Sequence, residues 1–330
     1  MRAITVNRPG GPGVLRLTKA SAPNAGPGQV VVKVAAAGVN FIDTYRRSGV
    51  YRIPFPHTPG SEGAGTVESL GPDVTTVRLG DRIAWANSAT GSYAQYAVVD
   101  AAQAIPVPTG LSLEIAAALP LQGLTADYLT HSTYRLGPED SALIYAAAGG
   151  VGQLATQMAL AAGTRVITTV GSPAKVGAVE ALGVAASQII TLSALANLAQ
   201  DLPAAVRQRT DGLGVNVAYD GIGKDTFAAT LASLRPRGMA VLYGGASGQV
   251  PPFDPQELNA HGSLYLTRPK LDDYIATPAE LQERAARVFD GIGTGSLKVS
   301  IGGRFPLAEA AAAHEAIESR QSQGKIILYT

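Results

Sequence analysis

The sequence predicts an α/β protein in which a doubly wound parallel sheet accompanies a second, mostly β domain. Its 330 residues exceed the size of one ordinary hydrophobic core, so two domains are expected. Up to about Val107, glycines and prolines separate short β-prone runs, whereas helix and strand patterns alternate from Ser141 to Tyr243. We place the domain boundary near residue 122, where the composition has become alanine-rich and helical.

The first segments of the chain are predicted to be strands. Arg2 to Asn7 and Leu15 to Lys19 alternate around a Gly-Pro turn, which indicates a hairpin. Gln29 to Ala37 is a further strand candidate, and Thr66 to Ser69 is one of several short β-prone runs between glycines and prolines. Strands at this spacing favour a compact, partly open barrel.

A helical stretch follows from Leu111. Ser112 suits the N-cap of this helix, because a serine hydroxyl accepts a hydrogen bond from a backbone amide of the first turn. Pro120 is expected to end or bend the helix, because proline lacks the amide hydrogen that a helix interior needs.

The segment from Ser141 to Thr169 has the order strand, glycine turn, helix, strand. The apolar run at 143–146 predicts a buried strand. The alanine-rich run at 153–162 predicts a helix that Gly163 ends, and the β-branched run at 165–170 predicts the next strand. The whole segment has the length of one βαβ unit.

The glycine turn of this unit matches a dinucleotide-binding fingerprint. Residues 147–152, AAGGVG, follow the spacing G-x-G-x-x-G with alanine in the first position. Gly149 would let the backbone approach a pyrophosphate, and Gly152 would let the helix pack against the strand. The amides of Gly150 and Val151 at the helix start would hold the anion. A tight turn without a ligand is the alternative, but the flanking pattern favours a Rossmann nucleotide-binding domain.

Helices and strands continue to alternate after this unit, as expected for a parallel sheet with helices on both faces. The predicted elements are Pro173 to Leu182, Gln188 to Leu192, Ala194 to Arg209, Val215 to Tyr219, Lys224 to Leu234 and Met239 to Tyr243, followed less regularly by Ser263 to Thr267, Pro278 to Asp290, Leu307 to Glu318 and Lys325 to Tyr329.

Composition excludes several classes of site. The formal net charge of +1 gives no global argument for binding nucleic acid or a membrane. The chain has no cysteine, so disulfides, thiolate zinc sites and cysteine nucleophiles are excluded. The N-terminus lacks the apolar stretch of a secretory signal, and we therefore expect a cytoplasmic protein.

The residues after the second strand of the nucleotide unit favour NADPH over NADH. A carboxylate usually stands there when the cofactor has a free ribose hydroxyl, but residues 168–175, TTVGSPAK, contain none. Ser172 and Lys175 would offer a hydroxyl and a cation to a 2′-phosphate. Alternatively, Ser172 caps the helix that Pro173 opens and Lys175 is solvated.

Together, these parts resemble the medium-chain dehydrogenase/reductase superfamily, and most closely its zinc-free, zeta-crystallin-like quinone oxidoreductases. The motifs that carry the resemblance are GVNFID at 38–43, PGSEG at 59–63, AAAGGVG at 146–152, YDGIG at 219–223 and TRP at 267–269. The resemblance implies a GroES-like catalytic domain of residues 1–122 and 264–330, and a Rossmann domain of residues 123–263.

The same resemblance indicates that catalysis needs no zinc. In zinc-dependent relatives, metal ligands stand at the positions of Asn40 and Ser61 and near Leu121, and none of these residues is a usual zinc ligand. Glu62 alone could not build a tetrahedral site. Quinones and conjugated enones accept hydride from a nicotinamide without a metal, provided that the protein orients them and donates hydrogen bonds.

The resemblance also assigns candidate residues around the nicotinamide and the acceptor. Asn40 and Tyr45 would border the pocket, Asp43 would support them, and Tyr45 would donate to the substrate oxygen. Tyr45 could instead be a packing aromatic residue, and Asn40 a turn-forming amide. Thr125 would meet the nicotinamide carboxamide, unless it is an ordinary helix residue.

Further cofactor contacts are implied at the edge of the sheet and near the 2′-phosphate. Tyr243 and Gly244 would line the cofactor channel, and Ser247 would add a contact. Arg320 would pair with the 2′-phosphate, or else be a solvated charge at a helix end. Leu192 stands where many relatives have a tyrosine near the adenosine phosphate.

We therefore predict a cytoplasmic, homodimeric NADPH-dependent quinone reductase that transfers hydride to a quinone in an interdomain cleft. Reduction of α,β-unsaturated aldehydes or ketones is the alternative reaction. A non-catalytic NADPH-binding role, as in crystallin-like or RNA-binding relatives, is the alternative class, although the near-neutral charge argues against nucleic acid as a partner. The four histidines show no metal-ligand spacing and are assigned surface or structural roles.

Overall fold

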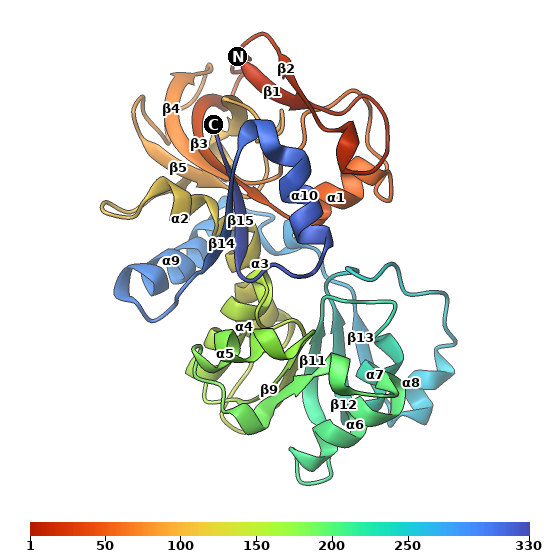
Figure 1. Cartoon of the computed structure of the whole chain (residues 1–330). Helices are drawn as coiled ribbons and strands as arrows, with labels where there is room; N and C mark the ends of the chain where they lie inside the picture. The colour runs from red at the N-terminus through yellow and green to blue at the C-terminus, as the bar shows by residue number, and fades with distance from the viewer. The chain divides into compact units, whose positions relative to one another are not determined.

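The computed structural model describes residues 1–330 as two compact units (Figure 1). The first unit contains Met1–Leu124 and Ile275–Thr330, and the second contains Thr125–Tyr274. The second boundary differs from the expected residue 264. Residues 265–274 belong to the second unit, because strand β13 (Tyr265–Thr267) pairs with β12 (Leu234–Leu242).

A seven-stranded sheet organises the first unit. Its strands run in the order β14-β15-β3-β4-β5-β7, with β6 also paired to β3. Their bounds are β3 Gln29–Val39, β4 Gly63–Leu70, β5 Arg82–Trp85, β6 Tyr96–Asp100, β7 Ile105–Pro106, β14 Ile301–Pro306 and β15 Lys325–Tyr329, and the separate hairpin is β1 Arg2–Thr5 with β2 Arg16–Lys19. The last strand lies inside the sheet, antiparallel to β3 and parallel to β14.

Five helices accompany this sheet: α1 Phe41–Ser48, α2 Leu113–Ala117, α3 Pro120–Tyr128, α9 Pro278–Thr294 and α10 Ala310–Glu318, of which α3 continues into the second unit. Ser112 caps α2 as expected, since its hydroxyl accepts from the Ile115 amide over 3.2 Å. Pro120 begins α3, because the first position of a helix needs no amide hydrogen. Helix α1 was not predicted from the sequence.

A six-stranded parallel sheet organises the second unit. The strand order β10-β9-β8-β11-β12-β13 is the doubly wound order of a Rossmann fold. The remaining bounds are β8 Ser141–Ile144, β9 Arg165–Val170, β10 Ile189–Thr191, β11 Val215–Asp220, α4 Gly150–Ala161, α5 Val176–Glu180, α6 Leu198–Gln208, α7 Phe227–Ala232 and α8 Gln256–Ala260. The sequence predicted α5, α6 and α7 as longer helices.

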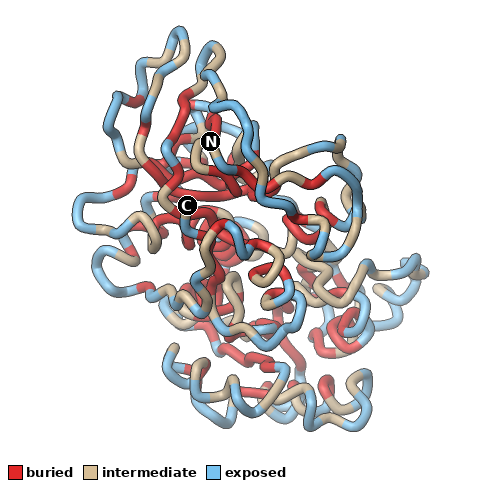
Figure 2. The backbone as a smooth tube through the Cα atoms, turned by 45° about the horizontal axis from the view of Figure 1, so that its top comes forward, coloured by how far each residue is buried: buried red, intermediate tan, exposed pale blue.

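The central strands of both sheets consist mostly of buried residues, whereas the edge strands β13 and β14 contain none (Figure 2). Every residue of β11 is buried, as expected for a central strand of a parallel sheet covered on both faces. In the first unit, Val30, Val32 and Val34 of β3 are buried in the same core as Trp85. None of the helices combines the length and the apolar composition that a membrane crossing requires.

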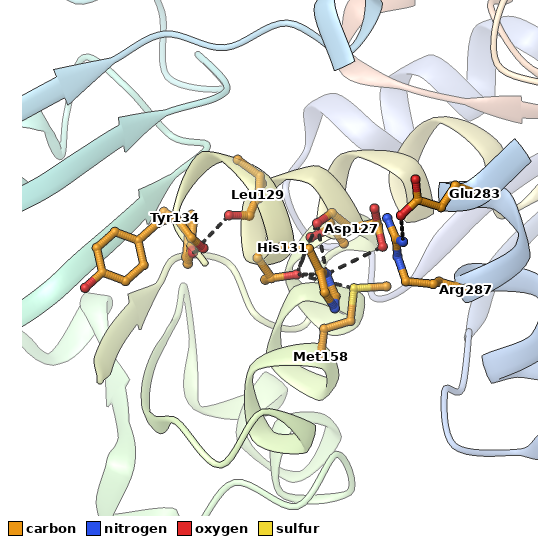
Figure 3. A network of polar contacts seen from close by, with 10 residues as sticks. Asp127, Leu129, His131, Tyr134, Met158, Glu283 and Arg287 are labelled. Carbon is orange, nitrogen blue, oxygen red and sulfur yellow. Dashed lines mark hydrogen bonds and ion pairs between the residues drawn. The ribbon is translucent and has the colours of Figure 1, made fainter. Parts of the chain in front are cut away.

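A polar network in the second unit joins the end of α3 to its neighbours (Figure 3). The chain leaves α3 through a π-helical turn, Leu129–Thr133. The Thr130 hydroxyl donates to the Ala126 carbonyl over 2.8 Å and lies 3.7 Å from the Met158 sulfur of α4. His131 Nδ1 lies 3.5 Å from the buried Asp127 carboxylate. The contacts of His131 with its own helical turn therefore indicate a structural role.

Candidate functional site

The amide side chain of Asn40 is buried and hydrogen-bonded at both ends. Asn40 follows β3 directly and caps α1. Its Nδ2 donates to Glu62 Oε1 over 2.7 Å. Its Oδ1 accepts from Lys325 Nζ over 2.7 Å and from Gln122 Nε2 over 3.3 Å. With only 3% of its surface exposed, Asn40 is held by groups from three distant parts of the chain.

Glu62 and Lys325 form an ion pair with no solvent exposure on either side chain. Glu62 uses its second oxygen, Oε2, to accept from the Leu121 amide over 2.7 Å. Burial lowers the pKa of Lys325, and the Glu62 charge opposes that effect. A side chain at Gly38 would collide with the Glu62 carboxylate, so the glycine of the GVN motif makes room for the pair.

The Asp43 carboxylate lies on α1 and accepts three hydrogen bonds. Ser61 Oγ donates to Oδ1 over 2.8 Å, and the Asn40 backbone amide donates to Oδ2 over 3.0 Å. The Tyr93 hydroxyl donates to Oδ2 over 3.3 Å. Burial raises the pKa of Asp43, while the hydrogen bonds from Ser61 and the Asn40 amide and the charges of Arg46 and Lys325 oppose the shift. Arg46 itself donates to Ser61 Oγ over 2.9 Å.

Tyr45 lies on the same helix and is half-buried. Its ring centroid is 5.4 Å from that of Tyr51, edge to face, and 6.1 Å from that of Phe41. The ring therefore packs against other aromatic residues, which is compatible with a hydroxyl group that also serves a ligand. Its role as a donor to the substrate remains a prediction.

The glycine turn of the second unit has the geometry that its fingerprint predicts. Gly149 is the N-cap of α4, and its amide donates to the Ala146 carbonyl over 2.8 Å. A Cβ atom on Gly152 would lie 2.9 Å from Ala147 Cα, so no side chain fits between the first turn of α4 and the turn that follows β8. The amides of Gly150, Val151 and Gly152 belong to the first turn of α4, where helix amides have no intrahelical acceptor.

The residues after β9 carry a hydroxyl and an amine but no carboxylate. Ser172 precedes a 3₁₀ turn, Pro173–Lys175, and its side chain makes no helix-capping hydrogen bond. The alternative in which the Ser172 side chain caps a helix is therefore wrong. Lys175 is half-buried, and burial lowers its pKa. Leu192 begins a 3₁₀ turn after β10.

The loop at the carboxyl end of β11 is fixed by the buried Asp220 carboxylate. Asp220 accepts from the amides of Ile222 and Gly223 over 2.8 and 3.0 Å. It also accepts from the hydroxyls of Thr226 and Thr230, each over 2.8 Å. Burial raises the pKa of Asp220, and these donors lower it. The YDGIG motif therefore forms a rigid loop at the edge of the sheet where ligands bind in such folds.

Tyr243 and Gly244 follow β12 and pack directly on this loop. A Cβ atom on Gly221 would lie 2.7 Å from the Tyr243 hydroxyl, so the two loops approach closely. Ser247 joins them, because its hydroxyl donates to the Ile222 carbonyl and accepts from the Asp225 amide, over 2.8 and 3.0 Å. The contact of Ser247 with the cofactor stays a prediction.

Two predicted cofactor contacts lie elsewhere in the chain. Thr125 is a buried residue of α3. Arg320 follows α10 in a left-handed conformation, with φ at +57°, and is exposed. Their contacts with the cofactor remain predictions.

Sequence reasoning missed the partners of Glu62. Lys325 was assigned only to a strand, and Gln122 was given no role. One signal was available: a carboxylate next to a buried strand needs a cation or several donors, because an unpaired buried charge is very costly. That argument would have prompted a search for a partner cation, without identifying Lys325.

Comparisons with known proteins establish the family. The family model for the alcohol dehydrogenase GroES-like domain matches residues 26–109, and the model called zinc-binding dehydrogenase matches residues 150–276. A quinone oxidoreductase from Pseudomonas aeruginosa is 41% identical over 320 residues, which cover 97% of this chain and 96% of that protein. The chain belongs to the quinone oxidoreductase family of the medium-chain dehydrogenase/reductase superfamily.

Two further relatives of this quinone oxidoreductase family member are informative. The crystal structure of Escherichia coli quinone oxidoreductase complexed with NADPH superposes with a TM-score of 0.95 at 38% identity, covering all of both chains. A 2-haloacrylate reductase from Burkholderia is 39% identical over 336 residues, covering 99% of this chain and 98% of that protein. The predicted combination of a GroES-like domain and a Rossmann domain is confirmed.

Proposed function

We propose that this family member is an NADPH-dependent quinone reductase that transfers hydride without zinc. The observation that carries the proposal is its full-length similarity, at about 40% identity, to proteins named quinone oxidoreductases. The test is NADPH and NADH consumption by the purified protein with a simple benzoquinone and a bulkier aromatic quinone. NADPH-specific turnover of either quinone supports the proposal, and inactivity with both contradicts it.

The described residues fit NADPH. The lack of a side chain at Gly152 lets α4 begin close against the turn at Ala146 and Ala147, and the first turn of α4 would supply amides to a pyrophosphate. Ser172 and Lys175 would hold the 2′-phosphate, and Arg320 is a further proposed contact of that phosphate. Thr125 would meet the nicotinamide carboxamide, and Tyr243, Gly244 and Ser247 would line the cofactor channel at the carboxyl edge of the sheet. When bound, the cofactor supplies the hydride.

The residues on and before α1 would then handle the acceptor. In hydride transfer to a quinone, negative charge develops on a carbonyl oxygen, and preorganised donors aimed at that oxygen lower the barrier. Tyr45 would donate from its hydroxyl, and Asn40 would donate from its amide. Asp43 would support both by fixing the start of the helix, since it accepts from the Asn40 backbone amide over 3.0 Å.

Zinc independence is part of the proposal. The side chains at the three positions that correspond to metal ligands offer an amide, a hydroxyl and an aliphatic group, and Glu62 is already paired with Lys325. This donor set does not fit a zinc ion. Turnover should survive prolonged dialysis against a chelator, and loss of activity that zinc restores would contradict the mechanism.

A conjugated alkene is the second candidate acceptor, and the 2-haloacrylate reductase among the relatives favours it. Reduction of an α,β-unsaturated aldehyde or ketone needs the same donors as quinone reduction, because charge again develops on a conjugated oxygen. Turnover of an enal alone would move the assignment to this reaction. Tight NADPH binding without turnover of any acceptor would favour a non-catalytic role.

A cytoplasmic homodimer formed through the nucleotide domain completes the proposal. Strand β13 is at the edge of its sheet, and Tyr265 on it is 59% exposed, which supports a contact there. Light scattering that gives the mass of one chain would contradict the dimer. Recovery of the protein in a membrane or extracellular fraction would contradict the location.

A further inference from the structure

The Asn40 amide is fixed by two opposite charges. Lys325 Nζ donates to its oxygen, and Glu62 Oε1 accepts from its nitrogen. An amide rotated by half a turn would place its oxygen against the carboxylate and its NH₂ group against the ammonium. Both contacts would be repulsive inside a region without solvent. The charges of the pair therefore select one orientation.

This orientation leaves one hydrogen of Asn40 Nδ2 without a partner in the structure. The amide nitrogen has two hydrogens, and only the bond to Glu62 uses one of them. Gln122 adds a third restraint, through a neutral hydrogen bond of 3.3 Å to the same Asn40 oxygen. The Gln122 oxygen is itself buried without a partner, so this side chain could turn over and cannot fix Asn40 alone.

Folding alone does not account for a lysine at this position. Residue 325 begins a strand whose neighbours Ile326 and Leu328 are apolar and buried. A buried ion pair is a weak source of stability, because the cost of removing both charges from water offsets their attraction. Apolar residues of similar size would often stabilise the fold equally well. The ion pair therefore calls for another explanation, and the group that it orients is the Asn40 amide.

We propose that Lys325 is a positioning residue for hydride transfer. Its ammonium locks and polarises the Asn40 amide, so that the second Nδ2 hydrogen is held ready for the oxygen on which charge develops. This inference rests on the proposed function and deepens it, because it assigns the preorganisation of one donor to a buried cation. Lys325 acts only through Asn40 and does not touch the substrate.

The test compares kcat, quinone KM and the dissociation constant of NADPH in the full-length protein. The variant Lys325→Met with Glu62→Gln removes both charges and keeps side chains of similar volume. The methionine makes no hydrogen bond to Asn40, and the glutamine keeps one of the two acceptor oxygens that Glu62 uses. We expect this variant to fold, with kcat lowered about tenfold or more and with KM and NADPH affinity within about threefold of wild type. Gln122→Leu is the matched control, which removes the neutral bond to the same oxygen and should lower kcat less.

A double-mutant cycle separates positioning from a general structural effect. If Lys325 acts through Asn40, the charge-free pair should cause no further loss of kcat in an Asn40→Ala background. Additive losses, an unchanged kcat, or failure of the charge-free variant to fold would each overturn the inference. If the wild type is active and the charge-free variant has the same kcat, only the inference about Lys325 is overturned. If the wild type reduces no acceptor, the proposed function is overturned as well.

Discussion

Arg47 donates from Nη1 to Nδ1 of His314 over 2.9 Å, deep in the first unit. An arginine can only donate, so Nδ1 is unprotonated and the ring proton lies on Nε2. Nε2 is 3.1 Å from the Tyr93 hydroxyl, which donates to Asp43. Arg47 also pairs with Glu318 over 2.6 Å. A one-directional chain of donors therefore runs from Arg47 to the carboxylate that fixes the start of α1.

This arrangement predicts acid sensitivity. Burial, and then the Arg47 charge, lower the pKa of His314 to about 3. As the pH falls below about 6.5, the imidazole of the unfolded chain takes up a proton and the native imidazole does not. The free energy of unfolding should therefore fall between pH 6.5 and pH 3, with this residue contributing about 2 kcal/mol of loss by pH 5.

Urea unfolding of the wild type and of His314→Asn at pH 7 and pH 5 measures that contribution. Asparagine can still accept from Arg47 but does not titrate. The variant should be less stable at pH 7 by roughly 1–3 kcal/mol, and its further loss on going to pH 5 should be smaller than that of the wild type. Parallel losses in the two proteins would show that His314 is not the titrating group.

Lys175→Ala should weaken NADPH binding and leave NADH binding almost unchanged. A charge-assisted hydrogen bond to a phosphate contributes about 1.5–3 kcal/mol, which corresponds to a rise of roughly 10- to 150-fold in the NADPH dissociation constant. Fluorescence titration with both cofactors checks this. Lys33→Ala, at an exposed position in the first unit, is the control. Equal losses for NADPH and NADH would exclude the phosphate contact.

Tyr45→Phe should lower kcat for quinone reduction by about 10- to 100-fold with little change in melting temperature. The variant keeps the aromatic packing against Phe41 and Tyr51 and removes only the hydroxyl. Loss of a single donor to a developing oxyanion typically has an effect of this order or larger. Tyr51→Phe, on the neighbouring ring, is the matched control. A kcat equal to that of the wild type would make Tyr45 a packing residue.

Gly152→Ala should disrupt the glycine turn. The added methyl group would lie 2.9 Å from Ala147 Cα, and overpacking of this kind costs about 1–3 kcal/mol. We expect a lower melting temperature and weaker binding of NADPH and NADH alike. Gly177→Ala is the control, since a Cβ there meets nothing within 4 Å and alanine favours a helix. A Gly152→Ala variant with normal cofactor affinity would contradict the close packing of α4 against this turn.

Local patterns were sufficient to predict the nucleotide unit but not the Asn40 cluster. The glycine turn and its flanking strand and helix lie within about one βαβ unit of sequence, so periodicity and turn chemistry identify them. Helix α1 is short and follows β3 without a loop, so no separate helical pattern marks it. Likewise, the boundary at Ile275 depends on β13 pairing with β12, a tertiary contact that composition does not report.

The Lys325–Glu62 pair shows most clearly what local sequence patterns cannot predict. Its members are separated by 263 positions in the sequence, and each has an unremarkable local context. A lysine at the start of a strand ordinarily indicates a solvated edge. Only the insertion of β15 between β14 and β3 buries it against the carboxylate.

The place of β15 in the first sheet has a consequence for biosynthesis. The second unit is one continuous segment and can fold as soon as residues 125–274 have been made, whereas the first unit needs the two separate segments 1–124 and 275–330. Until Lys325–Tyr329 is synthesised, the edges of β3 and β14 lack their shared partner and the Glu62 carboxylate lacks its cation. The nascent chain thus has a period in which the edges of β3 and β14 are exposed, and synthesis of β15 ends it.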